Sequence, residues 1–360
     1  MEKALVTIIV PAYNTEQYIG IMLDSIIRQS YSYLQIIVID DGSTDSTASI
    51  IKKYTKIDSR ITMFSSSHGG VSKARNLGLD YAKGEKVLFF DSDDFVEKDT
   101  VEQLLECCKK NNCNAAMCNY YDYYDEKDHI PYESELKGIY KSNKIVSELM
   151  PHYIGYSYGD INNWIIGTRQ LKQGKENNAL WRVLFDLNTI KQAGIRFDEM
   201  LSLGEDTIFL NEYFLNETSI CFTKEYLYHL RRRETGANMK SITNPILMAQ
   251  NKIKLIDGRM RLDKVARCKG MEIHDKWEGT MVFSALELAI RLAKNTGDKK
   301  KNKNIYKGYV RNENVSESIH RFRPIMRIKG LPFVLLRINP FLLYRFIRIM
   351  PENLIRYISQ

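Results

Sequence analysis

The sequence predicts an α/β fold in which a doubly wound sheet is flanked by helices and followed by a C-terminal helical extension. Three runs of apolar, mostly β-forming residues carry this prediction, at 5–11, 34–39 and 86–90. Segments with apolar residues at helical spacing lie between them, so strands and helices alternate at intervals of roughly 25 to 30 residues. Such alternation is typical of parallel strands joined by right-handed crossovers.

Each element of the N-terminal part has a local signal. The strand at 5–11 precedes a helix whose apolar side chains share one face, at positions 19, 22, 23, 26 and 27. After the strand at 34–39, Gly42 permits a tight turn, and a weaker strand is expected at 61–64. A helix is predicted from Gly69 to about Gly84. The helix after the strand at 86–90 repeats apolar residues at 101, 104, 105 and 108.

Between residues 120 and 180 the pattern fades into Tyr- and Asp-rich sequence with one possible helix near 142–150. Patterning returns at 181–185, and acidic residues open a helix at 205–210, where the helix dipole favours them. Two longer helices are expected further along, followed by a charged linker; their ranges are 244–266, 272–294 and 297–304.

Composition indicates a globular protein, because 44% of the 360 residues are apolar and 11% are aromatic. The formal charge of +8 is concentrated in the last forty residues, which hold eight arginines and lysines against Glu352. The six cysteines show no paired CxxC spacing, which favours reduced thiols over a zinc site. No secretory signal is recognisable, so a cytoplasmic location is expected.

Acidic or polar clusters follow the predicted strands, at 12–16, 40–45 and 91–94. The carboxyl ends of parallel strands share one edge of a sheet, so these clusters should line one crevice. Carboxylate oxygens suit hard cations, and Asp91 with Asp93 therefore predicts a site for Mn²⁺ or Mg²⁺. Taken alone, Asp91-Ser92-Asp93-Asp94 favours an ordinary solvated turn over a metal site.

Four segments in order, IIVPAYN, IIVIDDGSTDST, GGVSKARNLGLDYAKGEKVLFFDSDD and LGEDTIFL, closely resemble family 2 glycosyltransferases of the GT-A fold. The resemblance covers residues 5–105 and 180–233. It implies a Rossmann-like mixed sheet and an inverting transfer of a sugar from a nucleoside-diphosphate donor, usually UDP-linked, to an acceptor hydroxyl. The expected setting is bacterial surface-polysaccharide synthesis: capsule, exopolysaccharide or lipopolysaccharide.

The resemblance also implies roles for individual residues. Asp206, preceded by Glu205, matches the catalytic base, and Asp91 and Asp93 match the metal carboxylates. Tyr13 matches a stacking platform for the base, Asp41 a uracil contact, and Arg75 a diphosphate contact. The nucleotide-sugar site expected from these matches comprises Pro11, Ala12, Tyr13, Asn14, Glu16, Asp41, Lys73, Arg75, Asp91, Ser92 and Arg231.

The resemblance predicts a catalytic domain at 1–233, and helical patterning and charge predict a helical region at 234–320 and a basic tail at 321–360. The catalytic domain is expected to hold a donor half at 1–120 and an acceptor half at 121–233. One departure is that Trp181 is followed by Arg182-Val183, where family members often have Asn-Lys. That departure puts acceptor-side contacts in doubt. A nucleotidyltransferase and a nucleotide- or saccharide-binding subunit without catalysis remain alternatives.

The tail combines arginines with bulky apolar side chains and is interrupted by prolines. A spanning helix is disfavoured because each central arginine would cost about 2.5–3.5 kcal/mol. From Pro340 the residues Arg345, Arg348, Glu352 and Arg356 share one stripe, which predicts docking on an anionic membrane surface. The alternative is packing on the protein's own core or on a second subunit as a homodimer.

Membrane docking would place the enzyme peripherally on the inner face of the plasma membrane. A saccharide acceptor linked to polyprenyl diphosphate would then be natural. No nucleic acid is expected, because the aromatic residues of the tail lie among aliphatic ones.

Overall fold

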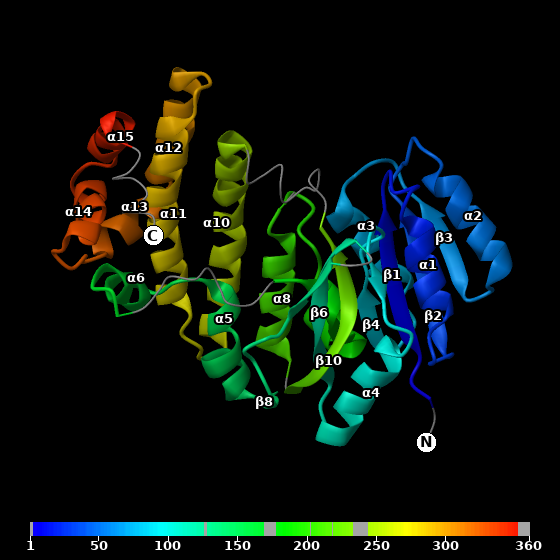
Figure 1. Ribbon diagram of the computed structural model, residues 1–360. Helices are drawn as coiled ribbons and strands as arrows, with labels where there is room; N and C mark the ends of the chain where they lie inside the picture. Colours follow the sequence, from blue (N-terminus) through cyan, green and yellow to red (C-terminus); the bar gives the residue numbers. More distant parts are fainter. Residues whose placement is uncertain are drawn as a thin grey trace. The chain divides into compact units, whose positions relative to one another are not determined.

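The computed structural model describes residues 3–125, 128–168, 178–201, 203–217, 219–232 and 244–351. The chain divides into two compact units (Figure 1), one formed by Met1–Met150 with Glu176–Glu234 and the other by Pro151–Lys175 with Thr235–Gln360. Residues 151–175, expected in the acceptor half, group with the second unit because Ile161 and Trp164 pack into its core. Residues 352–360 of the predicted tail lie outside the described residues.

Four parallel strands form the first part of the sheet, in the order β3-β2-β1-β4. They lie within one residue of the predicted bounds, at Val6–Ala12 (β1), Leu34–Asp40 (β2), Ile61–Ser65 (β3) and Lys86–Phe89 (β4). The helices that follow them are α1 (Ile19–Ile27), α2 (Thr47–Ile57), α3 (Val71–Tyr81) and α4 (Thr100–Asn111). Alternation of strand and helix in the sequence therefore predicted this half correctly.

The sheet continues beyond β4 as a mixed sheet, as the GT-A resemblance implied. Strand β9 (Val183–Asp186) runs antiparallel to both β4 and β6 (Ala115–Asp125), and β10 (Ser219–Arg231) runs parallel to β6. Short antiparallel partners complete it: β5 (Phe95–Val96), β7 (Asp128–Tyr132) and β8 (Ile139–Lys141). The remaining elements are η1 (Ile145–Leu149), η2 (Leu180–Arg182), α7 (Leu187–Ala193) and α8 (Glu205–Asn216).

Helix α3 packs closely on the parallel strands because Gly78 lacks a side chain. A Cβ at this position would lie 2.5 Å from Cγ2 of Ile9 on β1. All seven residues of β1 are buried, as expected for a central strand covered on both faces. The close packing of α3 fixes the helix that carries Arg75.

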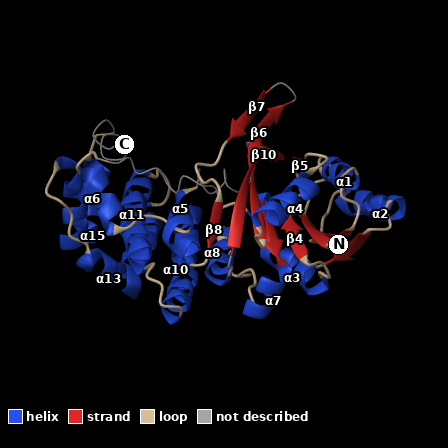
Figure 2. Ribbon diagram, turned by 90° about the horizontal axis from the view of Figure 1, so that it is seen from below, coloured by secondary structure: helices blue, strands red, loops and turns tan. Residues whose placement is uncertain are grey.

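The second unit is helical throughout its described residues (Figure 2). Its core surrounds α11 (His274–Lys294), where Met281, Ala285 and Leu288 are buried. The other helices are α5 (Pro151–Ile154), α6 (Tyr158–Ile165), α10 (Pro245–Cys268), α12 (Lys299–Arg311), α13 (Glu313–Arg321), η3 (Ile328–Gly330), α14 (Leu331–Ile338) and α15 (Pro340–Ile349). Among the described residues, no helix combines the length and apolar composition needed to cross a bilayer.

The predicted charged linker at 297–304 is wrong, because α12 begins at Lys299. The side chain of Asp298 caps this helix by accepting from the backbone N–H groups of Lys300 (2.8 Å) and Lys301 (3.1 Å). Tyr306 and Tyr309, about two and three turns beyond the cap, are fully buried. Local charge suggested a linker, whereas the cap and the two buried tyrosines stabilise a helix.

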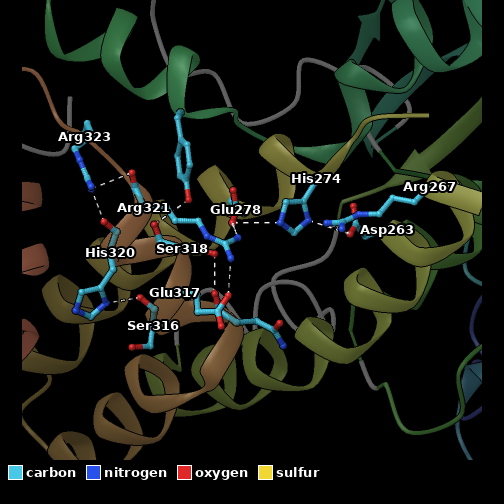
Figure 3. A network of polar contacts seen from close by, with 12 residues as sticks. Asp263, Arg267, His274, Glu278, Ser316, Glu317, Ser318, His320, Arg321 and Arg323 are labelled. Atoms are coloured by element: carbon cyan, nitrogen blue, oxygen red, sulfur yellow. Dashed lines mark hydrogen bonds and ion pairs between the residues drawn. The ribbon is translucent and has the colours of Figure 1, made fainter. Parts of the chain in front are cut away.

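A polar network joins α10, α11 and α13 in the second unit (Figure 3). The His274 ring lies between two buried carboxylates, with Nδ1 2.9 Å from Asp263 and Nε2 3.2 Å from Glu278. Arg321 donates from Nη1 to Glu278 at 2.6 Å and from Nη2 to Glu317 at 2.8 Å. Glu278 therefore accepts from Arg321 on α13 and lies 3.2 Å from His274 on its own helix, which ties these helices together.

Candidate active site

The predicted acidic and polar clusters meet at one edge of the sheet. Ala12, Asp40 and Ser65 are paired in register at the carboxyl ends of β1, β2 and β3, and Phe89 of β4 pairs with Ile9 of β1. The chain changes the side on which it adds strands between β1 and β4, and this is where open α/β sheets bind ligands.

The loops after β1 and β2 are hydrogen-bonded to each other. Asn14, with a positive φ of 49°, accepts at Oδ1 from the Thr44 N–H (2.8 Å), and Glu16 accepts at Oε2 from the Ser46 N–H (2.8 Å). Pro11 and Ala12 are buried in β1. Asn14 and Glu16 therefore shape the loops of the expected donor site, and donor contacts by these four residues remain predictions.

Asp41 organises the loop between β3 and α3. Its Oδ1 accepts from the Gly69 N–H (2.9 Å) and the Ser66 hydroxyl (2.8 Å), and its Oδ2 accepts from the Gly70 N–H (2.8 Å). The residue is buried. Both oxygens are thus committed to the protein, and the predicted uracil contact of Asp41 remains a prediction.

Tyr13 forms an exposed aromatic pair with His68. The two rings stack with centroids 4.0 Å apart and an interplanar angle of 26°, and Tyr13 is 42% exposed. His68 Nδ1 also lies 3.2 Å from Asp41 Oδ2. We did not predict His68 from the sequence; the available signal was its position directly before Gly69-Gly70, in the loop that follows a strand.

Arg75 joins the loop after β4 to the first turn of α8. Its Nη2 donates to Asp91 Oδ1 at 2.9 Å, its Nη1 donates to Asp206 Oδ1 at 2.6 Å, and Glu205 Oε1 lies 3.6 Å from Nη1. The guanidinium also lies over the Phe197 ring, 5.3 Å from its centroid, and Arg75 is buried. The expected neighbours Asp91 and Asp206 therefore face the same cation, although 115 residues separate them in the chain.

The same contacts bear on the role predicted for Arg75. Both terminal nitrogens of the guanidinium already donate to carboxylates, so Arg75 positions Asp91 and Asp206. Lys73, on the first turn of α3, is exposed. Diphosphate binding by Lys73 and Arg75 remains a prediction.

Glu205 and Asp206 begin α8, and Gly204 before them has a φ of 88° that favours glycine. Burial raises the pKa of Asp206 to about 8, with smaller contributions from Glu205 and Asp91, while Arg75 opposes the rise. Burial likewise raises the pKa of Glu205 against the effect of Arg75. A carboxylate whose pKa lies near neutrality can exchange a proton during a reaction at physiological pH.

The loop after β4 is fastened to β10. Asp94, which is buried, accepts at Oδ2 from the Tyr228 hydroxyl (2.7 Å) and at Oδ1 from the Arg231 N–H (2.7 Å). The Arg231 side chain donates from Nε to the Asp93 carbonyl at 2.9 Å. Asp94 and Tyr228 were not predicted as site residues, because their partners lie more than a hundred residues away in the chain.

Trp181 packs on Tyr228 from the core and so supports the contact between the loop after β4 and β10. The Trp181 ring lies 4.2 Å from the Tyr228 ring at an interplanar angle of 15°. Arg182, which stands where the family often has another residue, is fully buried. Neither side chain is open to a ligand, so their contribution is to position Tyr228 and β9.

The carboxylates after β4 fit a divalent cation. Burial raises the pKa of Asp94 well above its ordinary value, and Asp93 and Asp91 add to the rise, so negative charge is concentrated here. Asp91 keeps 32% of its side chain exposed, whereas Ser92 is buried. In the part of the chain that the structure describes, no three His, Cys, Asp or Glu side chains converge as a ready metal site. A cation held by two carboxylates and completed by substrate phosphates agrees with this arrangement.

Comparison with known proteins shows a family resemblance over the N-terminal part of the chain. Residues 7–166 match the family model described as glycosyl transferase family 2. Glycosyltransferase GlyA of Streptococcus pneumoniae is 34% identical over 63% of this chain and 31% of its own length. The uncharacterized glycosyltransferase EpsJ of Bacillus subtilis is 30% identical over 63% of this chain and 61% of its own length. The chain thus spans less than two thirds of either relative.

The fold is similar to that of residues 1–349 of TarS from Staphylococcus aureus, with a TM-score of 0.63 and 18% identity. The superposition covers 96% of this chain and 90% of that one. The GT-A-like mixed sheet and the C-terminal helical region are both part of that similarity. The segment 7–166 is therefore similar to glycosyltransferase family 2, and the relatives that share this similarity are described as glycosyltransferases.

Proposed function

We propose that this protein is an inverting glycosyltransferase that moves a sugar from a UDP-sugar, a UDP-hexose or UDP-N-acetylhexosamine, to a saccharide hydroxyl. The observation that carries the proposal is the shared ion pairing of Asp91 and Asp206 with Arg75. Asp91, which suits the donor side, and Asp206, which suits the acceptor side, therefore accept hydrogen bonds from the same guanidinium group.

Asp206 acts as the general base in this mechanism. It takes the proton of the acceptor hydroxyl while that oxygen attacks the anomeric carbon from the face opposite the diphosphate. A bond forms between the acceptor oxygen and the anomeric carbon, the bond from that carbon to the diphosphate oxygen breaks, and the nucleoside diphosphate leaves with the electron pair. One displacement inverts the configuration. Arg75 keeps Asp206 in place, and the raised pKa of Asp206 suits proton transfer near neutral pH.

Asp91 and Asp93 would hold Mn²⁺ or Mg²⁺, whose charge offsets the negative charge that develops on the departing diphosphate. Arg231 supports this loop by donating to the Asp93 carbonyl. Arg231 can also swing toward a bound diphosphate, because its guanidinium is held only by this bond and by the faces of Tyr18, Phe95 and Tyr123 within the described residues.

A UDP donor is supported by the TarS structure in complex with UDP-GlcNAc. That protein is described as a poly(ribitol-phosphate) β-N-acetylglucosaminyltransferase, which supports a cell-surface polymer as the product here. In this chain the exposed Tyr13 offers a flat face for the uracil base.

The test is release of UDP from a panel of UDP-sugars with Mn²⁺ present. We expect Asp206→Asn and Asp93→Ala to abolish turnover, and Asp80→Asn, which removes an exposed carboxylate of α3, to retain it. Equal turnover in all of these proteins would overturn the assigned roles. Pyrophosphate release from a sugar phosphate and UTP would instead indicate a nucleotidyltransferase. UDP binding that is indifferent to metal, without any turnover, would indicate a binding subunit.

We also propose that the tail docks on anionic lipid, which would bring the enzyme to a lipid-linked acceptor at the cytoplasmic face of the membrane. One face of α14 and α15 packs into the second unit through Phe333, Leu343 and Ile347. Large apolar side chains remain exposed on α14 and α15, namely Leu331, Ile338, Leu342, Phe346 and Ile349, and on the segment before them, namely Ile325, Met326 and Ile328. The arginines of the tail complement anionic headgroups.

Flotation with vesicles of phosphatidylglycerol and phosphatidylcholine tests the docking proposal. The variant Ile328→Ser, Ile338→Ser, Ile349→Ser removes exposed apolar groups without touching the buried face. We expect this variant to stay with the unbound protein and the wild type to float. Equal flotation of both, or no flotation of the wild type, contradicts membrane docking by this face.

A further inference from the structure

One face of the ribbon formed by β5, β10, β6 and β7 carries aromatic rings across all its strands. The register pairs Phe95 with His229, His229 with Tyr121, and Tyr123 with His129. Because side chains on paired positions point to the same side of a sheet, these five rings form a continuous aromatic face.

The rings of the aromatic face contact one another. Phe95 stacks on His229 with centroids 4.3 Å apart, and Tyr121 stacks on the same histidine at 5.1 Å. Tyr123 meets His129 edge to face at 4.8 Å and Phe95 at 5.0 Å. These contacts fix the positions of the rings, so the surface does not have to be organised when a ligand binds.

The opposite face of the ribbon serves the core. Tyr120 and Tyr228 point that way, where Tyr120 stacks on Tyr132 and Tyr228 stacks on Trp181. Both residues are buried. On the aromatic face, by contrast, Phe95, Tyr121 and Tyr123 remain partly exposed and His129 is exposed. Packing within the first unit therefore does not explain why these exposed positions carry aromatic rings.

The aromatic face adjoins the candidate active site through Arg231. The guanidinium lies 4.7 Å from the centroid of Tyr123 and 5.7 Å from that of Phe95, while its Nε donates to the Asp93 carbonyl. Arg231 thus contacts both the loop with the predicted metal ligands and the aromatic face, so the two are adjacent. A chain molecule lying along the rings would point one end toward the strand-end carboxylates.

The chemical character of the aromatic face indicates which class of ligand it can bind. Four of the five rings are tyrosine or histidine, which have an apolar face and a polar edge and so suit a partner that is itself partly polar. The Glu97 carboxylate, bound to His229 Nε2 at 2.8 Å and 46% exposed, and the Arg231 guanidinium add hydrogen-bonding groups at the border. A pyranose ring presents the complementary surface, with C–H groups on one face and hydroxyls around its rim.

We propose that the aromatic face binds the saccharide portion of the acceptor and directs its terminal hydroxyl toward Asp206. This inference rests on the proposed transferase function and adds to it the surface that receives the acceptor. The substrate class is a saccharide chain, whose sugar rings stack on Tyr121, Tyr123 and His129.

A glycan array of several hundred immobilised saccharides tests the proposal with the full chain. The test variant is Tyr123→Ser with His129→Ser, and His129→Ser alone is the milder variant, because His129 is exposed and makes no core contact that folding would require. The control is Tyr124→Ser, which removes an equally large ring of the same strand, 51% exposed, that is not one of the five rings of the aromatic face.

We expect the wild type to retain a group of related saccharides and the control to match it within about twofold. The double variant should lose about tenfold or more of that signal, and His129→Ser a smaller part, with the unfolding temperature of each checked against the control. Saccharide binding by the double variant equal to that of the wild type, or no binding by the wild type, overturns the proposal.

A separate measurement distinguishes failure of this inference from failure of the proposed function. Calorimetry with UDP and Mn²⁺ on the wild type tests the donor site alone. UDP binding without any saccharide retention refutes the aromatic face as the acceptor site and leaves the donor chemistry standing. Saccharide retention that depends on Tyr123 and His129 without UDP binding supports the aromatic face and refutes the transferase.

Discussion

Replacing Arg75 by methionine tests the structural basis of the site. The guanidinium is buried and donates to Asp91 at 2.9 Å and to Asp206 at 2.6 Å, with Glu205 at 3.6 Å. Methionine keeps much of the apolar stem but leaves these carboxylates without a cation. Breaking a buried ion pair on one side costs about 3–5 kcal/mol, and we expect a loss of this size in the free energy of unfolding at pH 8.

The loss should shrink at low pH, because the stranded carboxylates can take up protons in the folded state. Without Arg75 the raised folded-state pKa values of Glu205 and Asp206 rise further, so the folded variant binds more protons than the unfolded chain and loses stability as pH increases. Urea denaturation at pH 5 and pH 8 measures both effects. Arg196→Met is the matched control, since its ion pair with Asp80 is exposed and contributes less than about 1 kcal/mol.

The double variant Arg75→Met, Asp206→Asn should be less destabilised than the sum of the single variants, because the second change removes one of the stranded charges. A loss for Arg75→Met below about 1 kcal/mol at pH 8, or an equal loss at both pH values, would refute the reasoning.

Four further outcomes are expected. Asp206→Asn should gain thermal stability relative to the wild type as pH rises from about 4 to 8, because the pKa of Asp206 is near 8 when folded and near 4 when unfolded; parallel pH profiles of Tm would contradict this. Gly78→Ala should cost about 1–3 kcal/mol, since its Cβ would meet a β1 side chain, whereas Gly308→Ala in α12, with nothing within 4 Å, should be neutral or slightly stabilising in urea denaturation. Glu278→Ala should cost about 1–3 kcal/mol by leaving His274 and Arg321 without a shared acceptor, and an unchanged Tm would show the network to be incidental. Chelation with EDTA should stop UDP release and added Mn²⁺ should restore it, and turnover that EDTA does not affect would argue against a metal at Asp91 and Asp93.

The sequence was most informative where one interaction dominates the local structure. Buried parallel strands appear as continuous apolar runs, so β1, β2 and β4 were placed within one residue of their bounds. The convergence of the acidic clusters followed from the parallel arrangement alone. The partners of Arg75 did not follow from any local pattern, because Asp206 lies 131 residues away along the chain.

The region from 120 to 150 was the main gap in the prediction. Strand β6 begins with apolar residues, but from Tyr120 onward β6 and β7 are rich in tyrosine and aspartate and do not show the pattern of a buried strand. Their pairing with β9 and β10 supplies the stabilisation that the local sequence does not show. The alternation of Tyr121 and Tyr123 with Tyr120 and Asp122 was nevertheless present, and it separates the aromatic face from the core face.

The roles of single residues were harder to predict than their positions. Asp41 and Glu16 lie where a donor site was expected, yet their carboxylates accept hydrogen bonds from neighbouring loops. Asp94, which the sequence placed only as a neighbour of the metal carboxylates, bonds to Tyr228 and to the Arg231 backbone. Such assignments depend on contacts between distant segments, which a single sequence does not reveal.

The rate of UDP release by Asp206→Asn tests the catalytic role of Asp206 most directly. It is measured with the UDP-sugar that the wild type turns over fastest, in Mn²⁺ at pH 8, beside the control Asp80→Asn. We expect the rate of UDP release by Asp206→Asn to fall by about 10²-fold or more, while its affinity for UDP and the rate of the control stay unchanged. Turnover by Asp206→Asn within about twofold of the wild type would contradict the central claim that this carboxylate is the catalytic base.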